Sequence, residues 1–177
     1  MKTILVSGSS SGIGFAICEE SKKQGHNVIG ISRNINSRAT ELGIRSYSVD
    51  VTNQNQINEL VNNLTSENIT IDILINNAGL LIKDKFRDTT DDTFKKVYDV
   101  NVFGLANLTR ALLPIINTDG QVINISSIGG VNTSKKFPGL SAYASSKGAL
   151  ITLTEVLAEE YRSRPRFNCL ALGSVKT

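Results

Sequence analysis

Histidine and cysteine are scarce in this chain of 177 residues, and their scarcity excludes several kinds of chemistry. The one histidine is His26, and the two cysteines, Cys18 and Cys169, lie far apart in the sequence. Zinc and other transition metals are held by closely spaced residues of these types, so we expect no metal site. Cys18 falls in a helical pattern and Cys169 in a strand pattern, which favours small core residues in a reducing compartment.

Long apolar runs and clusters of one charge are also lacking. No apolar segment approaches the roughly 18 residues that a membrane-spanning helix needs, and no signal sequence precedes the first strand pattern. The formal net charge is +3, and the 19 Lys and Arg residues are scattered, mostly as short pairs, instead of forming a basic stripe. We therefore expect no membrane or nucleic-acid partner and a cytoplasmic location.

The sequence does contain short apolar runs that alternate with amphipathic segments along its whole length. The runs are rich in Ile, Leu and Val, as is typical of parallel strands covered on both faces. The alternation predicts βαβ units with right-handed crossovers in a single α/β domain over residues 1–177. The predicted strands are Thr3–Ser7, Asn27–Ser32, Arg45–Asp50, Ile71–Asn76, Gln121–Ser126 and Arg166–Leu172.

Helical spacing of apolar residues marks three of the segments between these strands. It predicts one helix around Ile57–Leu64, with Thr52 or Asn53 as its cap, and a longer helix marked by Phe94 to Leu108. A further helix is predicted around Ala149–Leu157, and Gly25 is placed to end the first helix of the chain.

The segment Gly8-Ser9-Ser10-Ser11-Gly12-Ile13-Gly14 fits two incompatible chemistries. As G-x-S-x-G it would be the nucleophile elbow of a hydrolase, which needs an acid and a histidine from later strand ends. His26 follows the first helix directly, so no such triad can form. As a glycine-rich turn between a strand and a helix, the segment instead predicts a site for the pyrophosphate of a dinucleotide.

The end of the second predicted strand bears on which dinucleotide is bound. Folds of this kind recognise the adenosine ribose about 20 residues beyond the glycines, with an acid for a free 2′-hydroxyl and an arginine for a 2′-phosphate. Ser32 and Arg33 occupy this position, and no carboxylate does. Because a guanidinium attracts a phosphate, the sequence favours NADP(H) over NAD(H).

Tyr143 and Lys147 are four residues apart in a helical pattern, and therefore share one face. A free tyrosine has a pKa of about 10, which makes it a poor acid–base catalyst at neutral pH. An ammonium one turn away stabilises the phenolate, so this pair is a candidate for proton transfer.

With these motifs in place, the sequence resembles the short-chain dehydrogenase/reductase family over nearly its whole length. The resemblance implies a Rossmann-type doubly wound parallel sheet, helices on both faces, strand order 3-2-1-4-5-6, and a missing C-terminal part of the family fold. The family's motifs occur here in order as Gly8-x-x-x-Gly12-x-Gly14, Asp50, Asn76-Asn77-Ala78-Gly79, Asn101, Asn124-Ile125-Ser126-Ser127, Tyr143-x-x-x-Lys147, and Asn168 leading to Gly173.

The resemblance also implies roles for residues at these positions. Tyr143 would exchange a proton with the substrate oxygen, Ser127 would hydrogen-bond that oxygen, and Lys147 would also hold the nicotinamide ribose. Asn101 would anchor a water that links Lys147 to solvent. The predicted cofactor contacts are Gly8, Ser10, Ser11, Gly12, Ile13, Gly14, Ser32, Arg33, Asp50, Val51, Asn77, Ala78, Gly79, Tyr143, Lys147, Val175 and Thr177.

The sequence departs from the family pattern in three places. Leu172 stands before Gly173 where the family usually has proline, which affects the placement of Val175 and Thr177. The spacing from Ser127 to Tyr143 is longer than usual, so a polar bulge is expected at 132–136 that reshapes the mouth of the pocket. The chain also stops where the family normally continues into a substrate-covering segment, and we expect a shortened chain.

The predicted function is an NADP(H)-dependent oxidoreductase acting on a small carbonyl or alcohol substrate, as a homodimer or homotetramer. Two alternatives stay open at this point. One is an epimerase of the same fold, and the other is a non-catalytic NADP(H)-binding sensor or scaffold.

Overall fold

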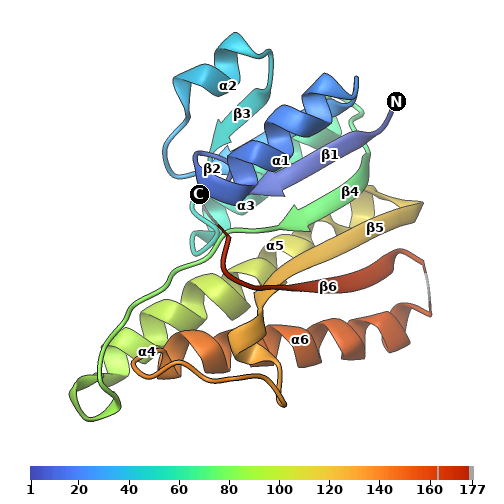
Figure 1. Ribbon diagram of the computed structural model, residues 1–177. Helices are drawn as coiled ribbons and strands as arrows, with labels where there is room; N and C mark the ends of the chain where they lie inside the picture. The colour runs from blue at the N-terminus through green and yellow to red at the C-terminus, as the bar shows by residue number, and fades with distance from the viewer. Residues whose placement is uncertain (163, 176–177) are drawn as a thin grey trace.

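In the part of the chain that the structure describes, six parallel strands form one sheet in the order β3-β2-β1-β4-β5-β6 (Figure 1). The computed structural model describes residues 1–162 and 164–175. The strand order is the one predicted for a doubly wound fold, and β6 is an edge strand. The strands are β1 Thr3–Ser7, β2 Asn27–Ser32, β3 Arg45–Ser48, β4 Ile71–Asn76, β5 Ile116–Ser127 and β6 Arg166–Leu172.

Helices cover both faces of the sheet. On one face, α1 and α2 pack over a cluster that includes Ile4, Val6 and Cys18. On the other, α3, α5 and α6 pack over a larger cluster that includes Leu5 and Leu74. The helices are α1 Gly12–Lys23, α2 Ser37–Glu41, α3 Gln54–Ser66, α4 Asp91–Tyr98, α5 Leu105–Leu112 and α6 Ser141–Tyr161.

The central strands are apolar on both faces because each face carries a helix layer. In β1, Ile4 and Val6 point to one layer and Leu5 to the other, and all three are buried. Burial on both sides explains the near-continuous apolar runs of the sequence. Cys18 is buried as predicted, whereas Cys169 is only partly buried because it lies on the edge strand.

Several element boundaries differ from those predicted. Strand β3 ends at Ser48, before the predicted Asp50, and β5 begins at Ile116 because that residue pairs with Ile71 ahead of an irregularity in the register. The predicted long helix is divided by a π-helical turn, η2 Asp99–Gly104. At Gly104 a β-carbon would lie 2.9 Å from the carbonyl oxygen of Val51, so the turn lies tightly against the loop after β3.

The caps of the helices follow the sequence more closely. Asn53 caps α3, its side-chain oxygen accepting from the N–H groups of Asn55 and Gln56. Gly25 follows the end of α1 in the left-handed conformation, with φ of 80°. Three short 3-10 turns complete the fold: η1 Phe86–Asp88, η3 Leu113–Ile115 and η4 Ile128–Gly130.

The topology brings the predicted motifs together at the carboxyl ends of the strands. Strand β1 pairs with β2 on one side and with β4 on the other, so the chain reverses its direction of winding there. A crevice opens outside the carboxyl ends of strands at such a reversal. The segments that follow β1, β2, β3, β4 and β5 therefore surround this position.

Candidate active site

The turn after β1 is built around glycines that no other residue could replace without movement. Gly8 and Gly12 adopt φ of 68° and 53°, the left-handed conformation that glycine adopts without strain. A β-carbon on Gly14 would lie 2.2 Å from the carbonyl oxygen of Gly8. The first turn of α1 can therefore lie against the strand end only because residue 14 is glycine.

Asn77 and Ser7 hold this turn to the end of β4. The Asn77 side-chain amide donates to the carbonyl oxygens of Ser7 and Gly8, at 3.1 and 3.2 Å. In return, the N–H groups of Asn77 and Ala78 donate to Ser7 Oγ, at 3.0 and 3.1 Å. The amide of Asn77, a predicted cofactor contact, is thus also part of the support of the glycine turn.

The N-terminus of α1 suits an anion. Ser11 is the N-cap residue, yet its side chain makes no capping hydrogen bond and the first turn carries no acid. The first N–H groups of a helix lack partners within it, and the helix dipole favours negative charge there. Phosphate oxygens are typical partners for such a position.

Beside this helix end lies a cleft of about 580 Å³. The predicted cofactor residues that line it are Gly8, Ser10, Ser11, Ser32, Arg33, Asp50, Val51, Asn77, Ala78 and Gly79. Lys96, Asp99 and Val100 also line it, from α4 and the π-helical turn. Nothing in the sequence indicated these three, because they reach the cleft only through the packing of α4.

Asp50 and Arg33 both line this cleft, but they differ in whether their charged groups have partners among the described residues. The Asp50 carboxylate accepts from the N–H and Oγ1 of Thr52, at 2.9 and 2.7 Å, and so stabilises the turn after β3. Arg33 is exposed, and no salt bridge among the described residues engages its guanidinium. Its neighbour Ser32 donates to the carbonyl oxygen of Asn34 at 2.7 Å.

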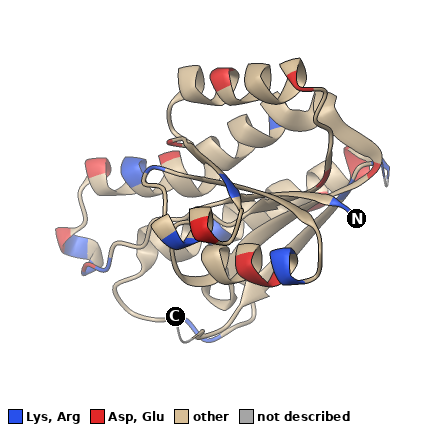
Figure 2. Ribbon diagram, turned by 90° about the horizontal axis from the view of Figure 1, so that it is seen from above, with Lys and Arg blue, Asp and Glu red and all other residues tan. Residues whose placement is uncertain are grey.

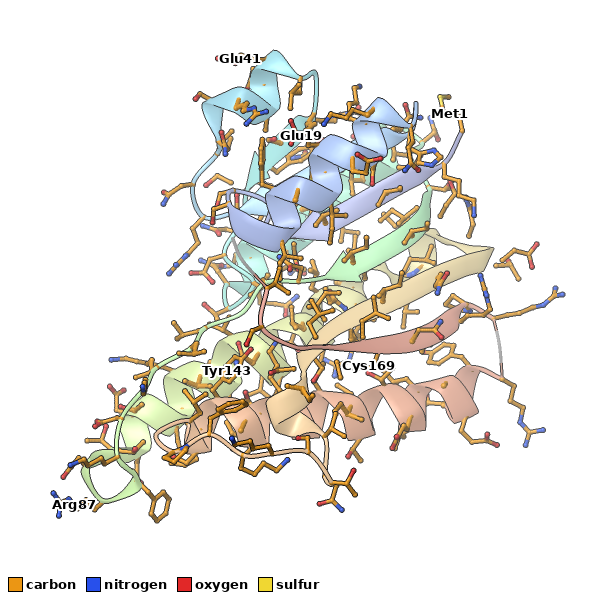
Figure 3. The ribbon with its side chains drawn as sticks, in the orientation of Figure 1. Met1, Glu19, Glu41, Arg87, Tyr143 and Cys169 are labelled. Atoms are coloured by element: carbon orange, nitrogen blue, oxygen red, sulfur yellow. The ribbon has the colours of Figure 1, made fainter. Side chains whose placement is uncertain are left out.

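Lys147 and Tyr143 lie together near the start of α6, as their spacing predicted. Lys147 Nζ is 5.9 Å from the centroid of the Tyr143 ring, and Figure 3 labels Tyr143 at this end of the helix. The lysine is only 4 % exposed, and its ammonium donates to the carbonyl oxygen of Ile125 at 2.8 Å. Burial lowers the pKa of Lys147 from 10.5 to about 8.

Ser127 ends β5 and starts the 3-10 turn η4. Its Oγ accepts from the N–H of Gly129 at 3.2 Å. Because this bond uses an acceptor site of the hydroxyl, the Ser127 hydrogen stays free to donate.

Asn101 is fully buried in the π-helical turn. Its Oδ1 accepts from the N–H of Leu80 at 2.7 Å, and its Nδ2 donates to the Leu80 carbonyl oxygen and to Ser146 Oγ. A β-carbon on Gly79 would lie 3.5 Å from both Asn101 Oδ1 and Lys147 Nζ, so these groups converge on the loop after β4. The Asn101 side chain thus joins that loop to α6, and its role toward a water stays a prediction.

A ladder of buried polar side chains supports the site from beneath. Asn76 Nδ2 donates to Thr109 Oγ1 and to Asn124 Oδ1, each at 2.8 Å. Asn124 Nδ2 donates in turn to Thr154 Oγ1 at 2.8 Å. These bonds join α5, β4, β5 and α6, and sequence reasoning missed them because each depends on the packing of separate elements.

The remaining predicted residues lie elsewhere or outside the description. Gly12 and Ile13 lie with Val175 around an apolar hollow on α1, and not among the residues lining the cleft. Val175 is 50 % exposed. Thr177 lies outside the described residues.

Charges of both signs are mixed over the surface outside the cleft. Figure 2 shows Lys and Arg interspersed with Asp and Glu along the helices. Within residues 1–162 and 164–175, His, Cys, Asp and Glu nowhere gather in threes that could hold a metal ion. In the same described part of the chain, every helix is too short or too polar to cross a membrane.

Comparison with known proteins gives consistent matches. The family model for short chain dehydrogenase matches residues 2–177. Oxidoreductase UcpA of Escherichia coli K12 is 36 % identical over 186 residues, covering 99 % of this chain and 70 % of UcpA.

Solved structures show the same similarity. A short-chain dehydrogenase from Streptomyces avermitilis is 35 % identical with a TM-score of 0.82, and the match covers 97 % of this chain but only 64 % of that one. A short chain dehydrogenase from Leptospira borgpetersenii with bound NAD+ is 27 % identical, with a TM-score of 0.89 over 99 % of this chain and 72 % of that one. This chain thus spans less than two thirds of the Streptomyces protein.

Proposed function

The chain belongs to the short-chain dehydrogenase family, and from this premise we propose that it is an NADP(H)-dependent oxidoreductase of small carbonyl or alcohol substrates. The observation that carries the proposal is the buried ammonium of Lys147 beside the Tyr143 ring. A protein that only binds the cofactor has no need of a phenol beside this cation. A proton-transfer site does, because the cation stabilises the phenolate.

The residues of the site fit a bound dinucleotide. The glycine turn allows the close approach of a pyrophosphate, and the N-terminus of α1 offers it N–H groups and a favourable dipole. The cleft beyond the turn has room for an adenosine next to Ser32 and Arg33. When bound, the nicotinamide supplies or accepts the hydride.

The protein's own groups handle the oxygen of the substrate. In reduction, the Tyr143 hydroxyl gives its proton to the carbonyl oxygen, and in oxidation the phenolate takes the proton from the alcohol. The Ser127 hydroxyl, already accepting from Gly129, donates a hydrogen bond to the same oxygen and stabilises the charge that develops there. The Lys147 ammonium stabilises the negative charge left on the Tyr143 oxygen once its proton has been transferred.

We further propose that NADP(H) is preferred to NAD(H). Arg33 lines the cleft with no salt bridge to another described residue, so its charge is available for a 2′-phosphate. The carboxylate of nearby Asp50, in contrast, accepts hydrogen bonds from the N–H and the hydroxyl of Thr52.

One experiment tests both parts of the proposal. The rate of NADPH consumption is measured with a panel of aldehydes and ketones, then repeated with NADH, and the affinity for each cofactor is measured separately by calorimetry. We expect turnover with at least one carbonyl and a higher kcat/KM for NADPH. Binding of NADPH without turnover of any probe would favour a sensor or scaffold, and a higher kcat/KM for NADH would reject the cofactor preference.

We also propose a homodimer or homotetramer formed through the helical segments that carry Asn101 and Tyr143. Phe103 in the π-helical turn and Val156 on α6 are each 56 % exposed, and α4 packs against α6. Large apolar side chains exposed on neighbouring helices are typical of subunit interfaces.

A further inference from the structure

The segment between Ser127 and Tyr143 contains the lengthened stretch 132–136, which the proposed function leaves without a role. It begins with the 3-10 turn Ile128–Gly130, whose Gly129 N–H donates to Ser127 Oγ. Whatever fixes this turn therefore also fixes the direction of the Ser127 hydroxyl.

One side of the turn is fixed by α6. A β-carbon on Gly130 would lie 2.6 Å from the backbone of Lys147 and of Gly148, so turn and helix are in direct backbone contact. Ser126 Oγ donates to the carbonyl oxygen of Lys147 at 2.8 Å, which secures the same junction. On this side the turn cannot move without moving Lys147.

The other side of the turn is fixed by the lengthened stretch itself. The ammonium of Lys136 donates to the carbonyl oxygen of Gly129 at 3.0 Å and also to the carbonyl oxygen of Val131. The Ser134 hydroxyl, which has one hydrogen to donate, lies within hydrogen-bond distance of the carbonyl oxygens of Ile128 and Val131. The side chains of Ser134 and Lys136, both from 132–136, thus bind the backbone carbonyl oxygens of the turn and of the residue after it.

Lys135 provides a natural comparison with its neighbour. Both lysines are exposed, but among the described residues no hydrogen bond or salt bridge involves Lys135. Lys136 alone of the pair reaches back to the turn. A cation at the carbonyl end of a helical turn is favoured both by the hydrogen bonds and by the direction of the peptide dipoles.

We propose that Lys136 is a positioning residue, which holds the turn Ile128–Gly130 against α6 and thereby directs the Ser127 hydroxyl toward the substrate oxygen. Ser134 assists by binding one of the two carbonyl groups within its reach. The proposal rests on the proposed function for the role of Ser127, but not for the contact between Lys136 and the turn.

The test compares Lys136→Met with Lys135→Met in the full chain. Methionine keeps much of the length and removes the ammonium, so each variant loses one charge from the same surface. Hydrogen–deuterium exchange of the unliganded protein is followed over the peptide that contains 126–136. Turnover is followed with NADPH and the aldehyde or ketone that the wild type reduces fastest.

We expect faster exchange at 128–131 in Lys136→Met only. Since misplacing a catalytic group by about 1 Å can cost up to about 100-fold, we expect kcat to fall about tenfold in Lys136→Met. The KM for NADPH should change less than kcat, because the residues that line the cofactor cleft do not include the turn Ile128–Gly130. Lys135→Met should match the wild type in both measurements.

Distinct results would overturn this proposal and the proposed function. Equal exchange in the two variants, or faster exchange in Lys136→Met with unchanged kcat, overturns the positioning role. A wild type that reduces no carbonyl overturns the proposed function, and the exchange comparison then still decides whether Lys136 holds the turn.

Discussion

Lys147 is the one lysine or arginine that is buried in the described part of the chain, and its neighbours explain how the charge is tolerated. Its ammonium has the Ile125 carbonyl oxygen as acceptor and the face of the Tyr143 ring nearby. A buried ammonium is costly without such partners. Under the proposed function, the positive charge is needed beside the catalytic phenol. This need explains why the folded protein keeps a buried cation there in spite of its unfavourable free energy.

Removing the phenol oxygen should remove catalysis and leave binding. In Tyr143→Phe the ring still packs beside Lys147, but no proton can be exchanged with the substrate. General acid–base catalysis contributes about 10²–10⁴-fold, so we expect kcat to fall by at least about 100-fold. Steady-state rates with NADPH check the fall, and calorimetry should show cofactor affinity close to that of the wild type. Full activity in this variant would reject Tyr143 as the acid.

The lowered pKa of Lys147 predicts a dependence of stability on pH. Its pKa is lowered from 10.5 to about 8 by burial. Between these two values the unfolded chain binds the proton and the folded chain does not, so stability rises with pH across this window. Below about pH 8 both states are charged and the folded state bears the full cost, at most about 3 kcal/mol.

Urea unfolding of the wild type and Lys147→Met checks this pH dependence. The free energy of unfolding of the wild type, less that of the variant, should increase from about pH 7 to about pH 10. A constant difference would show that the folded protein keeps Lys147 charged throughout.

At the scale of elements, the junction of β1 and α1 is the most tightly constrained turn of the site. Gly14→Ala would place a β-carbon 2.2 Å from the Gly8 carbonyl oxygen, so strand and helix must separate. Such overpacking costs about 1–3 kcal/mol, and the displaced helix end should also lose affinity for NADPH. Thermal unfolding and calorimetry measure the two effects.

Gly173→Ala is the control for this substitution. A β-carbon at Gly173 would meet no atom of the described residues within 4 Å, so the melting temperature should hardly change. If Gly14→Ala melted and bound NADPH like the wild type, the turn would be looser than its geometry indicates.

The boundaries that sequence reasoning missed were set by contacts between distant elements. The strand predicted to begin at Gln121 begins instead at Ile116, because that residue pairs with Ile71. The π-helical turn around Asn101 lies where Gly104 approaches Val51 closely, a contact between distant residues that no local pattern encodes. The strands themselves were predictable because burial on both faces leaves a local signature in Ile, Leu and Val.

The local geometry of the candidate site was predictable to a similar degree and for a similar reason, whereas the roles of its residues stay predictions. Gly8 and Gly12 adopt backbone conformations that favour glycine, and Tyr143 and Lys147 are joined by helical spacing, so both motifs are local. The ladder from Thr109 to Thr154 and the contact of Lys136 with Gly129 join residues whose proximity exists only in the folded chain.

At the scale of the whole molecule, the proposed assembly depends on apolar side chains exposed on helices. Phe103→Ser should lower the molecular mass in solution from that of a dimer or tetramer toward a monomer, because it removes apolar area from the interface. Multi-angle light scattering measures this mass. Phe86→Ser is the control, since Phe86 is 74 % exposed but lies in the loop before α4. Equal masses for the two variants would place the interface elsewhere.

The position of β6 at the sheet edge has a consequence for handling the protein. Strand β5 pairs with one side of β6, and no strand within the described residues pairs with the other side, next to Leu170, which is 48 % exposed. An open edge of this kind is a template on which another chain can add a strand. In a polypeptide of these 177 residues, unwanted β-addition and precipitation at high concentration should therefore begin at β6, and a lysine in place of Leu170 would be the first remedy.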